Sequence, residues 1–454
     1  MADLDAIFKA YDIRGTFPNE IDAEGCRAIG AAFARFALDE GGAVPEILVG
    51  RDMRPSGAEL AEAFSDGVRS QGVDVVDLGL ASTDLVYFAS GSRGAPGAMF
   101  TASHNPAQYN GIKFCLAGAR PVGADTGLDR IKELARTGVA PTERRGNASK
   151  IDLLGSFAEH VRSFVDVSKF RPLKVVADTA NGMGGLVVPA VFEALPFELE
   201  ILYPELDGTF PNHPADPIQP ENQRDLQARV RDVGADVGFA FDGDADRVFV
   251  VDEQGNGLSG SVTTAMVAVG MLEKEPGGTV LHNLICSKTV PEVVREHGGT
   301  PVRTKVGHSF IKAEMAATGA VFGGEHSAHY YFRDNYRADS GLIASMMVLE
   351  RLCAGSEPMS ALRAPYDRYA DSGEINTQVN DPAAVIDAVA AEFARRTPSA
   401  AQDRLDGLTV DFGDWWFNLR PSNTEPLLRL NLEARTRDEC DEHTSELLHL
   451  ITKG

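Results

Sequence analysis

The feature that most constrains this chain is a hexapeptide, Asp242-Gly-Asp-Ala-Asp-Arg247, which carries three carboxylates at alternate positions. Alternate residues of an extended segment point to the same side, so Asp242, Asp244 and Asp246 are expected to converge on one point. Three carboxylates that crowd together need a cation among them, because like charges at short range repel strongly. Ligands that are all oxygen suit a hard ion such as Mg2+. The hexapeptide therefore predicts a magnesium site.

A polar surface turn is the plain alternative for this hexapeptide. Two apolar runs argue against it, because residues 237–241 lead into the acidic cluster and residues 248–251 lead out of it. The carboxylates therefore stand between two predicted strands. A calcium-binding EF-hand loop is excluded, since the glutamate due at its twelfth position would be Glu253, which belongs to a predicted turn after a strand.

Net charge restricts the partners that this chain can bind. With 43 lysine and arginine residues against 66 aspartate and glutamate residues, the formal net charge is -23. Such a chain lacks the basic face that sequence-independent nucleic-acid binding requires, and it is not attracted to anionic membrane surfaces. A small anionic substrate would need a local basic pocket that overcomes the overall field. We therefore expect neither nucleic acid nor a membrane as a partner.

Cysteine usage and the first residues indicate the compartment. The five cysteines are scattered and no CxxC occurs, so neither a disulfide framework nor a zinc ribbon is expected. A reducing cytoplasm fits this usage best. The N-terminal sequence MADLDAIFKAYDIRG lacks a basic segment followed by an apolar core, so no signal peptide is expected. No stretch approaches the roughly 20 apolar residues of a membrane span.

Length and the alternation of elements predict several domains. At roughly 100–200 residues per domain, a chain of 454 residues corresponds to two to four domains. Strand-like and helix-like runs alternate over most of the chain, which indicates α/β layers. After residue 356 the pattern becomes β-α-β-β-β-α, which predicts a separate α+β domain. The predicted domains are residues 1–150, 151–254, 255–365 and 366–454.

One pattern occurs three times and links the first three domains. A short strand rich in glycine and alanine enters a polar loop, and a strand with aromatic or branched residues follows, at residues 97–114, 235–251 and 319–332. Such units also occur in unrelated proteins, and the three share little sequence identity. We predict three related α/β domains with mixed sheets, each presenting one polar loop at a strand end, where α/β sheets bind ligands.

The first of these polar loops has the sequence Thr101-Ala-Ser-His-Asn-Pro106. Ser103 could act as a nucleophile while His104 or Lys113 handles protons. The plain alternative is a capping serine beside an ordinary loop histidine. No G-x-S-x-G sequence surrounds Ser103, which argues against acyl transfer.

Two later loops carry groups suited to a phosphorylated sugar. In Gly-Gly-Glu-His-Ser-Ala-His, Glu325, Ser327 and His329 stand at alternate positions and could grip vicinal hydroxyls, although a satisfied histidine pair is the alternative. Residues 420–426, Arg-Pro-Ser-Asn-Thr-Glu-Pro, combine an arginine with backbone and hydroxyl donors, and Arg429 follows on the next strand. That composition matches a phosphate-binding loop, with an ordinary turn as the alternative.

Together, TASHNP, DGDADR, GE-x-S-x-H and RPSNTEP, in this order and at these separations, closely resemble the motifs of the α-D-phosphohexomutase superfamily. The resemblance covers essentially the whole chain, and the third motif is most similar to the phosphomannomutase/phosphoglucomutase branch. It implies four domains in a heart shape around a central cleft. It also implies Mg2+ as cofactor, a hexose 1,6-bisphosphate as activator, a phosphosugar substrate, and a monomer or homodimer.

The resemblance also implies roles for individual residues. Ser103 corresponds to a serine that becomes phosphorylated. Asp242, Asp244 and Asp246 correspond to the ligands of a Mg2+ ion that also contacts the phosphoserine, and Arg247 corresponds to an active-site arginine of the same loop. Basic residues in the motif loops would supply the local positive pocket that so acidic a chain requires.

Two assignments remain broader. The general acid or base is left open among His104, Lys113 and His329. The residues expected to bind the phosphosugar are Tyr11, Arg14, Lys305, His308, Glu325, Ser327, Arg420, Ser422, Asn423, Thr424 and Arg429.

The expected activity is a reversible interconversion of mannose 1-phosphate and mannose 6-phosphate through an enzyme phosphoserine and a 1,6-bisphosphate, with a place in GDP-mannose biosynthesis. Phosphoglucomutase or dual activity, then phosphoglucosamine mutase, are the alternatives. His326 and the pair Tyr330-Tyr331 depart from close relatives and leave the preferred C2 epimer open. A non-catalytic phosphosugar-binding regulator would be expected to lack the serine or the metal ligands, and here all are present.

Overall fold

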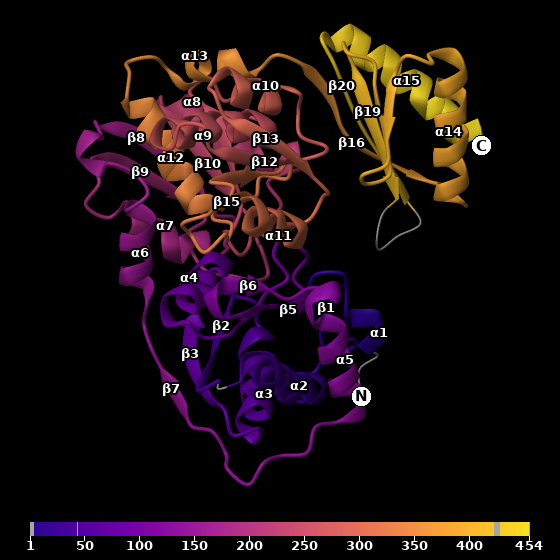
Figure 1. Ribbon diagram of the computed structural model, residues 1–454. Coiled ribbons are helices and arrows are strands. Elements are labelled where there is room, and N and C mark those ends of the chain that lie inside the picture. The colour runs from indigo at the N-terminus through magenta and orange to yellow at the C-terminus, as the bar shows by residue number, and fades with distance from the viewer. Residues whose placement is uncertain (1–3, 43, 422–426, 454) are drawn as a thin grey trace.

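The computed structural model describes residues 4–42, 44–421 and 427–453, and these ranges form four β-sheets flanked by helices (Figure 1). We call each sheet with its helices a domain, numbered 1 to 4 in chain order. None of the helices in the described ranges has the length and hydropathy that a membrane crossing requires.

Domain 1 contains a mixed sheet of seven strands in the order β1-β5-β4-β2-β3-β7, with β6 paired to β5. Its helices α2 and α3 pack closely because Gly30 and Gly67 lie at the crossing; a Cβ on Gly30 would lie 2.1 Å from the carbonyl oxygen of Phe64. The elements are α1 (Leu4–Ile7), β1 (Ile13–Thr16), α2 (Ala23–Gly41), β2 (Glu46–Arg51), α3 (Gly57–Ser70), β3 (Asp74–Leu80), α4 (Thr83–Arg93), β4 (Gly97–Phe100), β5 (Tyr109–Leu116), β6 (Arg120–Pro121), α5 (Leu128–Thr137) and β7 (Ala148–Lys150).

Domains 2 and 3 each contain a mixed sheet of four strands, in the orders β11-β10-β8-β9 and β13-β12-β14-β15. Domain 2 contains α6 (Leu154–Arg162), β8 (Leu173–Asp178), α7 (Gly184–Phe192), β9 (Phe197–Leu202), α8 (Arg224–Val233), β10 (Val237–Phe241) and β11 (Val248–Asp252). Domain 3 contains α9 (Gly260–Lys274), β12 (Thr279–Asn283), α10 (Thr289–Glu296), β13 (Thr300–Thr304), α11 (His308–Thr318), β14 (Phe322–Gly324), β15 (Tyr330–Phe332), α12 (Gly341–Cys353) and α13 (Met359–Arg363).

The three strand–loop–strand units have the same pairing in their sheets. The strands that enter the polar loops, β4, β10 and β14, each pair in parallel with a strand formed earlier in the chain. Each also pairs antiparallel with the strand that leaves its loop, namely β5, β11 or β15. The predicted fold class, three related α/β domains with mixed sheets, is therefore confirmed.

Domain 4 is an antiparallel sheet in the order β16-β20-β19-β18-β17, with two helices. The predicted pattern omitted β17, a strand of only three residues with the polar sequence Ala-Gln-Asp, which has no apolar alternation. Its elements are β16 (Ala370–Gln378), α14 (Pro382–Arg396), β17 (Ala401–Asp403), β18 (Leu408–Asp411), β19 (Trp416–Pro421), β20 (Leu427–Ala434) and α15 (Arg437–Lys453). The prediction of a C-terminal α+β domain is confirmed.

The hydrophobic cores divide the molecule differently from the sheets. One continuous core includes Leu48 and Phe88 of domain 1, Phe239 of domain 2 and Phe322 of domain 3. The described part of domain 4 contributes nothing to it and has a separate core around Phe393. Figure 1 accordingly shows domain 4 standing beside domain 3, while the other three domains pack together.

Polar contacts join domain 4 to domain 3. The Lys288 ammonium lies 2.6 Å from a carboxylate oxygen of Asp411, and its backbone N–H donates to the carboxylate of Glu433 at 2.9 Å. Arg303 and Asp403 form a further ion pair. These contacts are ion pairs and hydrogen bonds, and polar interfaces between domains are of the kind that permits relative domain motion.

Candidate active site

The loop after β4 places Ser103 in a left-handed backbone conformation, with φ of +48°. The side chain of Arg54, itself 1% exposed, holds this loop by donating to the carbonyl oxygens of Ser103 at 2.9 Å and Asn105 at 2.6 Å. It also donates to the carbonyls of Pro106 and Tyr109. A buried arginine thus fixes the backbone that carries the candidate nucleophile.

The loop after β10 carries the three aspartates, but it is not extended as predicted. Ala245 has a φ of +60° and its N–H donates to the carbonyl oxygen of Asp242 at 3.1 Å, so the segment is a tight turn. The carboxylates nevertheless converge: one oxygen from each of Asp242, Asp244 and Asp246 lies within 4.8 Å of the others. The predicted convergence is therefore confirmed, whereas the reason given for it was wrong.

The serine loop and the aspartate loop are in direct contact. A Cβ placed on Gly243 would lie 2.4 Å from the carbonyl oxygen of Ser103, so only glycine permits this approach without displacement. The hydroxyl of Ser103 donates to Asp242 at 2.8 Å, and Arg247 donates through Nη2 to the same hydroxyl oxygen at 3.0 Å. Arg247 Nη2 also lies 2.6 Å from Nδ1 of His104. Ser103 is therefore held between a carboxylate and a guanidinium.

Protein cations offset part of the charge of the aspartates. The Lys113 ammonium lies 2.8 Å from Asp244 and 2.7 Å from Asp246, while Arg247 lies 2.8 Å from Asp242. When all three carboxylates are ionised, these two cations leave one negative charge in excess. The hydroxyl of Thr83, at the first turn of α4, also donates to Asp244 at 2.5 Å.

Burial and these charges shift the pKa values of the groups at the site. Burial raises the pKa of Asp242 to about 7, against the opposing effect of Arg247. For Asp244, burial acts in the same direction but the Lys113 ammonium overrides it and holds the pKa below its usual range. Burial acts against the charge on Lys113, yet the carboxylates beside it raise its pKa well above normal. Burial, followed by the charge of Arg247, lowers the pKa of His104 well below normal.

The aspartate loop also fits a divalent cation. Among the described residues, Oδ1 of Asp244 and Oδ1 of Asp246 are buried and accept no hydrogen bond. Such orphaned carboxylate oxygens are costly unless they meet a proton donor or a metal. All the donors are oxygen and the cluster has excess negative charge, which is the chemistry that Mg2+ prefers.

Domain 3 contributes Glu325, Ser327 and His329 from the loop after β14. Glu325 is 2% exposed and accepts hydrogen bonds from the hydroxyl of Tyr331 at 2.6 Å and the amide of Asn283 at 3.0 Å. Ser327 is half-buried. His329 lies against the aspartate loop, with Nδ1 3.9 Å from a carboxylate oxygen of Asp246. His329 therefore contacts the aspartate loop.

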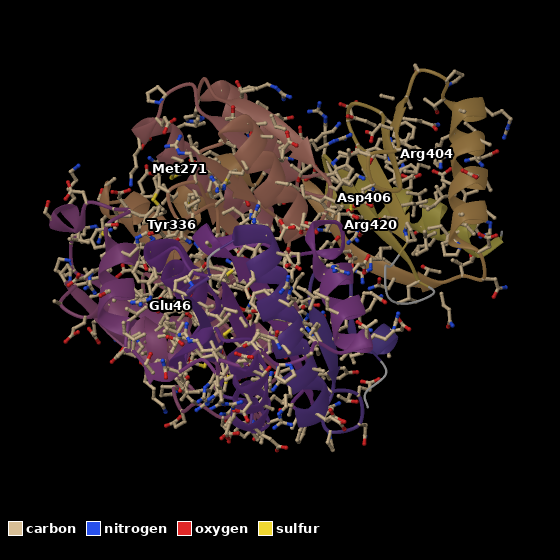
Figure 2. The ribbon with its side chains drawn as sticks, turned by 60° about the horizontal axis from the view of Figure 1, so that its bottom comes forward. Glu46, Met271, Tyr336, Arg404, Asp406 and Arg420 are labelled. Atoms are coloured by element: carbon tan, nitrogen blue, oxygen red, sulfur yellow. The ribbon has the colours of Figure 1, made fainter. Side chains whose placement is uncertain are left out.

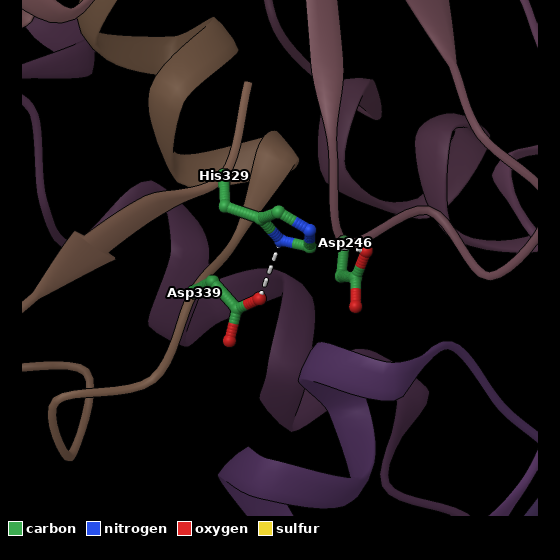
Figure 3. A group of neighbouring side chains, drawn as sticks. All are labelled: Asp246, His329 and Asp339. Carbon is green, nitrogen blue, oxygen red and sulfur yellow. Dashed lines mark hydrogen bonds and ion pairs between the residues drawn. The ribbon is translucent and has the colours of Figure 1, made fainter. Parts of the chain in front are cut away.

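Figure 3 shows how His329 is oriented between two carboxylates. Its Nδ1 forms a hydrogen bond of 2.8 Å with Asp339, and its backbone forms an isolated bridge with Arg247. Burial alone would lower the pKa of His329, but Asp246 and Asp339 raise it. His329 thus links the third domain to the aspartate loop of the second.

Four predicted substrate residues come from the N-terminal segment and from the stretch between the end of β13 and the first residue of α11. Arg14 donates to the carbonyl oxygen of Ala102 at 2.9 Å, so it lies at the serine loop. Tyr11 packs edge-on against Phe310, and the exposed Lys305 lies 5.5 Å from the centroid of the same ring. His308 is the first residue of α11.

The predicted phosphate loop of domain 4 lies partly outside the described residues, because Ser422, Asn423 and Thr424 are not among them. Arg420 and Arg429 are described, and both form ion pairs with Glu374, at 2.7 Å and 3.1 Å. Figure 2 shows Asp406 and Arg420 near each other at the edge of domain 4 that faces the other domains.

Electrostatic effects link that edge of domain 4 to Tyr11. Burial, followed by the charges of Asp406 and Glu325, raises the pKa of Tyr11, while Arg420 opposes the shift. The backbone N–H of Val306 also donates to the carboxylate of Asp406 at 3.2 Å. Tyr11 of domain 1 thus packs on Phe310 of domain 3, and Asp406 of domain 4 binds the backbone of Val306 in the same part of domain 3.

Sequence reasoning missed several residues at this site. Arg54 lies in the loop after β2, and the rule that strand ends carry ligands would have pointed to it. Thr83 and Asp339 had weaker signals, since each stands beside a helix-capping serine, Ser82 or Ser340, and serine caps are common.

Comparison with known protein families finds a match for each of the four domains. Sequence models of phosphoglucomutase/phosphomannomutase match most of the chain: alpha/beta/alpha domain I at residues 5–140, domain II at 155–256, domain III at 259–369 and the C-terminal domain at 374–449.

Relatives cover nearly all of the chain. It is 42% identical over 432 residues to a protein of Xanthomonas campestris pv. campestris named "Phosphohexose mutases", covering 94% of this chain and 95% of that one. It is 40% identical over 455 residues to the phosphomannomutase of Salmonella montevideo, covering 98% of each. The crystal structure of a phosphoglucomutase/phosphomannomutase family protein from Burkholderia thailandensis matches with a TM-score of 0.89 and 33% identity, covering 100% of this chain and 99% of that chain.

Proposed function

Because the chain belongs to the phosphoglucomutase/phosphomannomutase family, we propose that it interconverts hexose 1-phosphates and hexose 6-phosphates, with mannose phosphates as its principal substrates. The observation that carries this proposal is the position of the Ser103 hydroxyl, held between Asp242 at 2.8 Å and Arg247 at 3.0 Å. A serine in that setting suits reversible phosphoryl transfer, in which positioning and charge neutralisation dominate over covalent chemistry. Relatives named phosphomannomutase support the choice of mannose.

In the proposed cycle, phosphorylated Ser103 donates its phosphoryl group to O6 of mannose 1-phosphate or to O1 of mannose 6-phosphate. The bond from phosphorus to Ser103 Oγ breaks as the bond to the sugar oxygen forms, giving mannose 1,6-bisphosphate. The bisphosphate turns around in the site and returns its other phosphoryl group to Ser103. A hexose 1,6-bisphosphate added from solution would phosphorylate unmodified Ser103 in the same way, and would thereby activate the enzyme.

The residues around Ser103 would manage charge during this transfer. A phosphoserine carries a charge of about -2, and Arg247 is already within hydrogen-bond distance of the serine oxygen. Mg2+, which Asp242, Asp244 and Asp246 would hold, would offset further charge on the phosphoryl group. Lys113 keeps the carboxylates of the loop partly neutralised, since its ammonium is paired with two of them.

Among the three candidates for the proton handler, we propose His329. Lys113 is held as an ammonium ion by two carboxylates, which raise its pKa. The Nδ1 of His104 already accepts from Arg247, and its lowered pKa disfavours a proton-bound form. His329 has its Nδ1 on Asp339, which leaves Nε2 for the proton of the sugar hydroxyl that attacks.

Parallel coupled assays with mannose 1-phosphate, glucose 1-phosphate and glucosamine 1-phosphate test the proposed activity. We expect turnover with the first two and the highest kcat/KM with mannose 1-phosphate. A higher kcat/KM with glucose or glucosamine 1-phosphate would contradict the preference for mannose. No turnover with any phosphosugar, despite binding, would favour a phosphosugar-binding regulator.

Replacing Arg420 with alanine is expected to lower kcat/KM mainly by raising KM, because this arginine would hold the phosphate that does not react. Its guanidinium is held by the carboxylate of Glu374 at 2.7 Å, which fixes the orientation of an anion-binding group. Loss of one charge-assisted contact costs about 1.5–3 kcal/mol, which corresponds to roughly a tenfold to hundredfold fall in kcat/KM.

The matched control for this prediction is Arg404→Ala, since Arg404 is an exposed arginine of the same domain that pairs with Asp387. Figure 2 labels both arginines. Steady-state kinetics should distinguish the two variants, with Arg404→Ala behaving like the parent. Parent-like kinetics in Arg420→Ala would mean that this loop does not grip the substrate.

A further inference from the structure

Asp339, the carboxylate that binds His329, is itself bound by a second side chain, at a place where three domains meet. Asp339 is 2% exposed, and one of its oxygens, Oδ2, lies 2.8 Å from Nδ1 of His329. The other oxygen lies 2.9 Å from the ammonium of Lys312, which is also 2% exposed. Asp339 is thus buried with a cation beside one oxygen and an imidazole beside the other. This arrangement is suited to orienting the imidazole.

Helix α4 of domain 1 contacts both Lys312 and the residue next to Asp339. The Lys312 ammonium lies 3.9 Å from the centroid of the Tyr87 ring, at cation–π distance, and Tyr87 belongs to α4. Ser340, next to Asp339, caps α12 and donates to Asp84 of the same helix α4 at 2.7 Å. Asp339 is thus fixed by backbone, by charge and by a neighbouring domain.

The geometry around His329 selects one form of its ring. When Nδ1 donates to a carboxylate, the neutral imidazole carries its lone pair on Nε2. Figure 3 shows that this second nitrogen points away from Asp339. The side chain of His329 is 20% exposed, so the ring is not sealed inside the protein.

We propose that Asp339 is a positioning residue that fixes the orientation and the tautomer of His329, with Lys312 and Tyr87 holding Asp339 in place. This inference rests on the proposed function, in which Nε2 of His329 accepts the proton of the attacking sugar hydroxyl. Asp339 itself touches neither sugar nor phosphate in that reaction. A hydrogen bond to the nitrogen opposite the reacting one commonly sets the tautomer of a histidine base.

Two other accounts of this cluster are weaker. Asp246, His329 and Asp339 bring their oxygen and nitrogen atoms within 4.8 Å of one another, as a metal site would. However, Oδ2 of Asp339 accepts the hydrogen bond of His329, and the Lys312 ammonium, 2.9 Å from Oδ1, already supplies the positive charge that a metal ion would bring. The second account is a purely structural brace between the first and third domains, and the experiment must separate that from positioning.

The test compares Asp339→Asn with the double variant Lys312→Met/Asp339→Asn. The single variant leaves a buried ammonium beside a neutral amide, whereas the double variant removes both charges and restores the balance. We expect kcat to fall about 100-fold or more in both variants with KM within about twofold of the parent, because the asparagine amide can hold the wrong tautomer. The melting temperature should fall in the single variant and recover in the double variant.

Recovery of kcat together with the melting temperature in the double variant would overturn the proposal. A purely structural brace would then explain the loss of both quantities in the single variant. A parent-like kcat in Asp339→Asn would also overturn it. If His329→Ala loses kcat while Asp339→Asn does not, only this inference fails. If His329→Ala keeps a parent-like kcat, the proposed role of His329 fails as well.

A readout independent of turnover is the 15N spectrum of the histidine side chains. The signal of His329 is identified as the one missing from His329→Ala. At a pH above the raised pKa of His329, we expect the parent protein to show the form with hydrogen on Nδ1 and a lone pair on Nε2, and the double variant to show a mixture of both neutral forms. An unchanged His329 spectrum in the double variant would contradict the proposal even if no substrate were known.

Discussion

Replacing Ser103 with alanine should reduce mutase turnover by on the order of 1,000-fold or more, the scale on which covalent catalysis fails without its nucleophile. Transfer through the enzyme requires the serine oxygen, and no other hydroxyl is described between Asp242 and Arg247. Intact-mass measurement should find one labile phosphate on the parent protein after incubation with a hexose 1,6-bisphosphate. That phosphate should be absent from Ser103→Ala.

The fold should survive this change. Alanine and serine have similar difficulty in adopting the φ of +48° found at this position, and Asp242 keeps its ion pair with Arg247 at 2.8 Å. Ser92→Ala is the matched control, because Ser92 is an exposed serine of α4 in the same domain. Near-parent turnover by Ser103→Ala, with an unchanged melting temperature, would refute the phosphoserine mechanism.

The second large effect is expected from Asp244→Asn, which should lower the affinity for Mg2+ and the rate together. Asp244 offers a buried oxygen that accepts no hydrogen bond among the described residues, and an amide oxygen without charge binds a hard cation less tightly. At limiting Mg2+ we expect kcat/KM to fall by about 100-fold or more. A titration with Mg2+ should move the half-saturation point to higher concentration.

Asp232→Asn provides the control, because it makes the same chemical change on an exposed residue of α8. Excess EDTA should remove the activity of the parent protein, and added Mg2+ should restore it. Activity that persists in EDTA would mean that the aspartate loop works with its protein cations, Lys113 and Arg247, alone.

Much of the architecture could be predicted from local sequence patterns. Glycine-rich strands followed by polar loops led to the three related units, since the period of two and the loop composition are both local signals. The extra strand β17 could not be predicted in this way, because a polar strand of three residues gives no pattern. The continuous core that unites three domains was also beyond prediction, as it depends on how separate sheets pack.

The residues of the candidate site were predicted better than the backbone geometry that brings them together. Asp242, Asp244 and Asp246 do come together, yet a turn at Ala245 brings them there, and positive φ at alanine leaves no mark in a sequence. Arg54 and Asp339 act on the site through other residues. Such supporting groups are far from their partners in sequence, so only the folded chain reveals them.

The separate core of domain 4 bears on how the protein is made. The core that the first three domains share draws on residues from Leu48 to Tyr366, so a growing chain cannot complete it before Tyr366 has left the ribosome. Domain 4 then needs only its own side chains, from Val385 to Ile451, to complete its core. Domains generally fold as units during synthesis. Domain 1 also has a core of its own, from Leu4 to Ala135, which includes Phe100 and Ile112 on the strands beside the serine loop and can form earlier. The serine loop therefore gains support before the shared core is complete, and Arg420 is added after both.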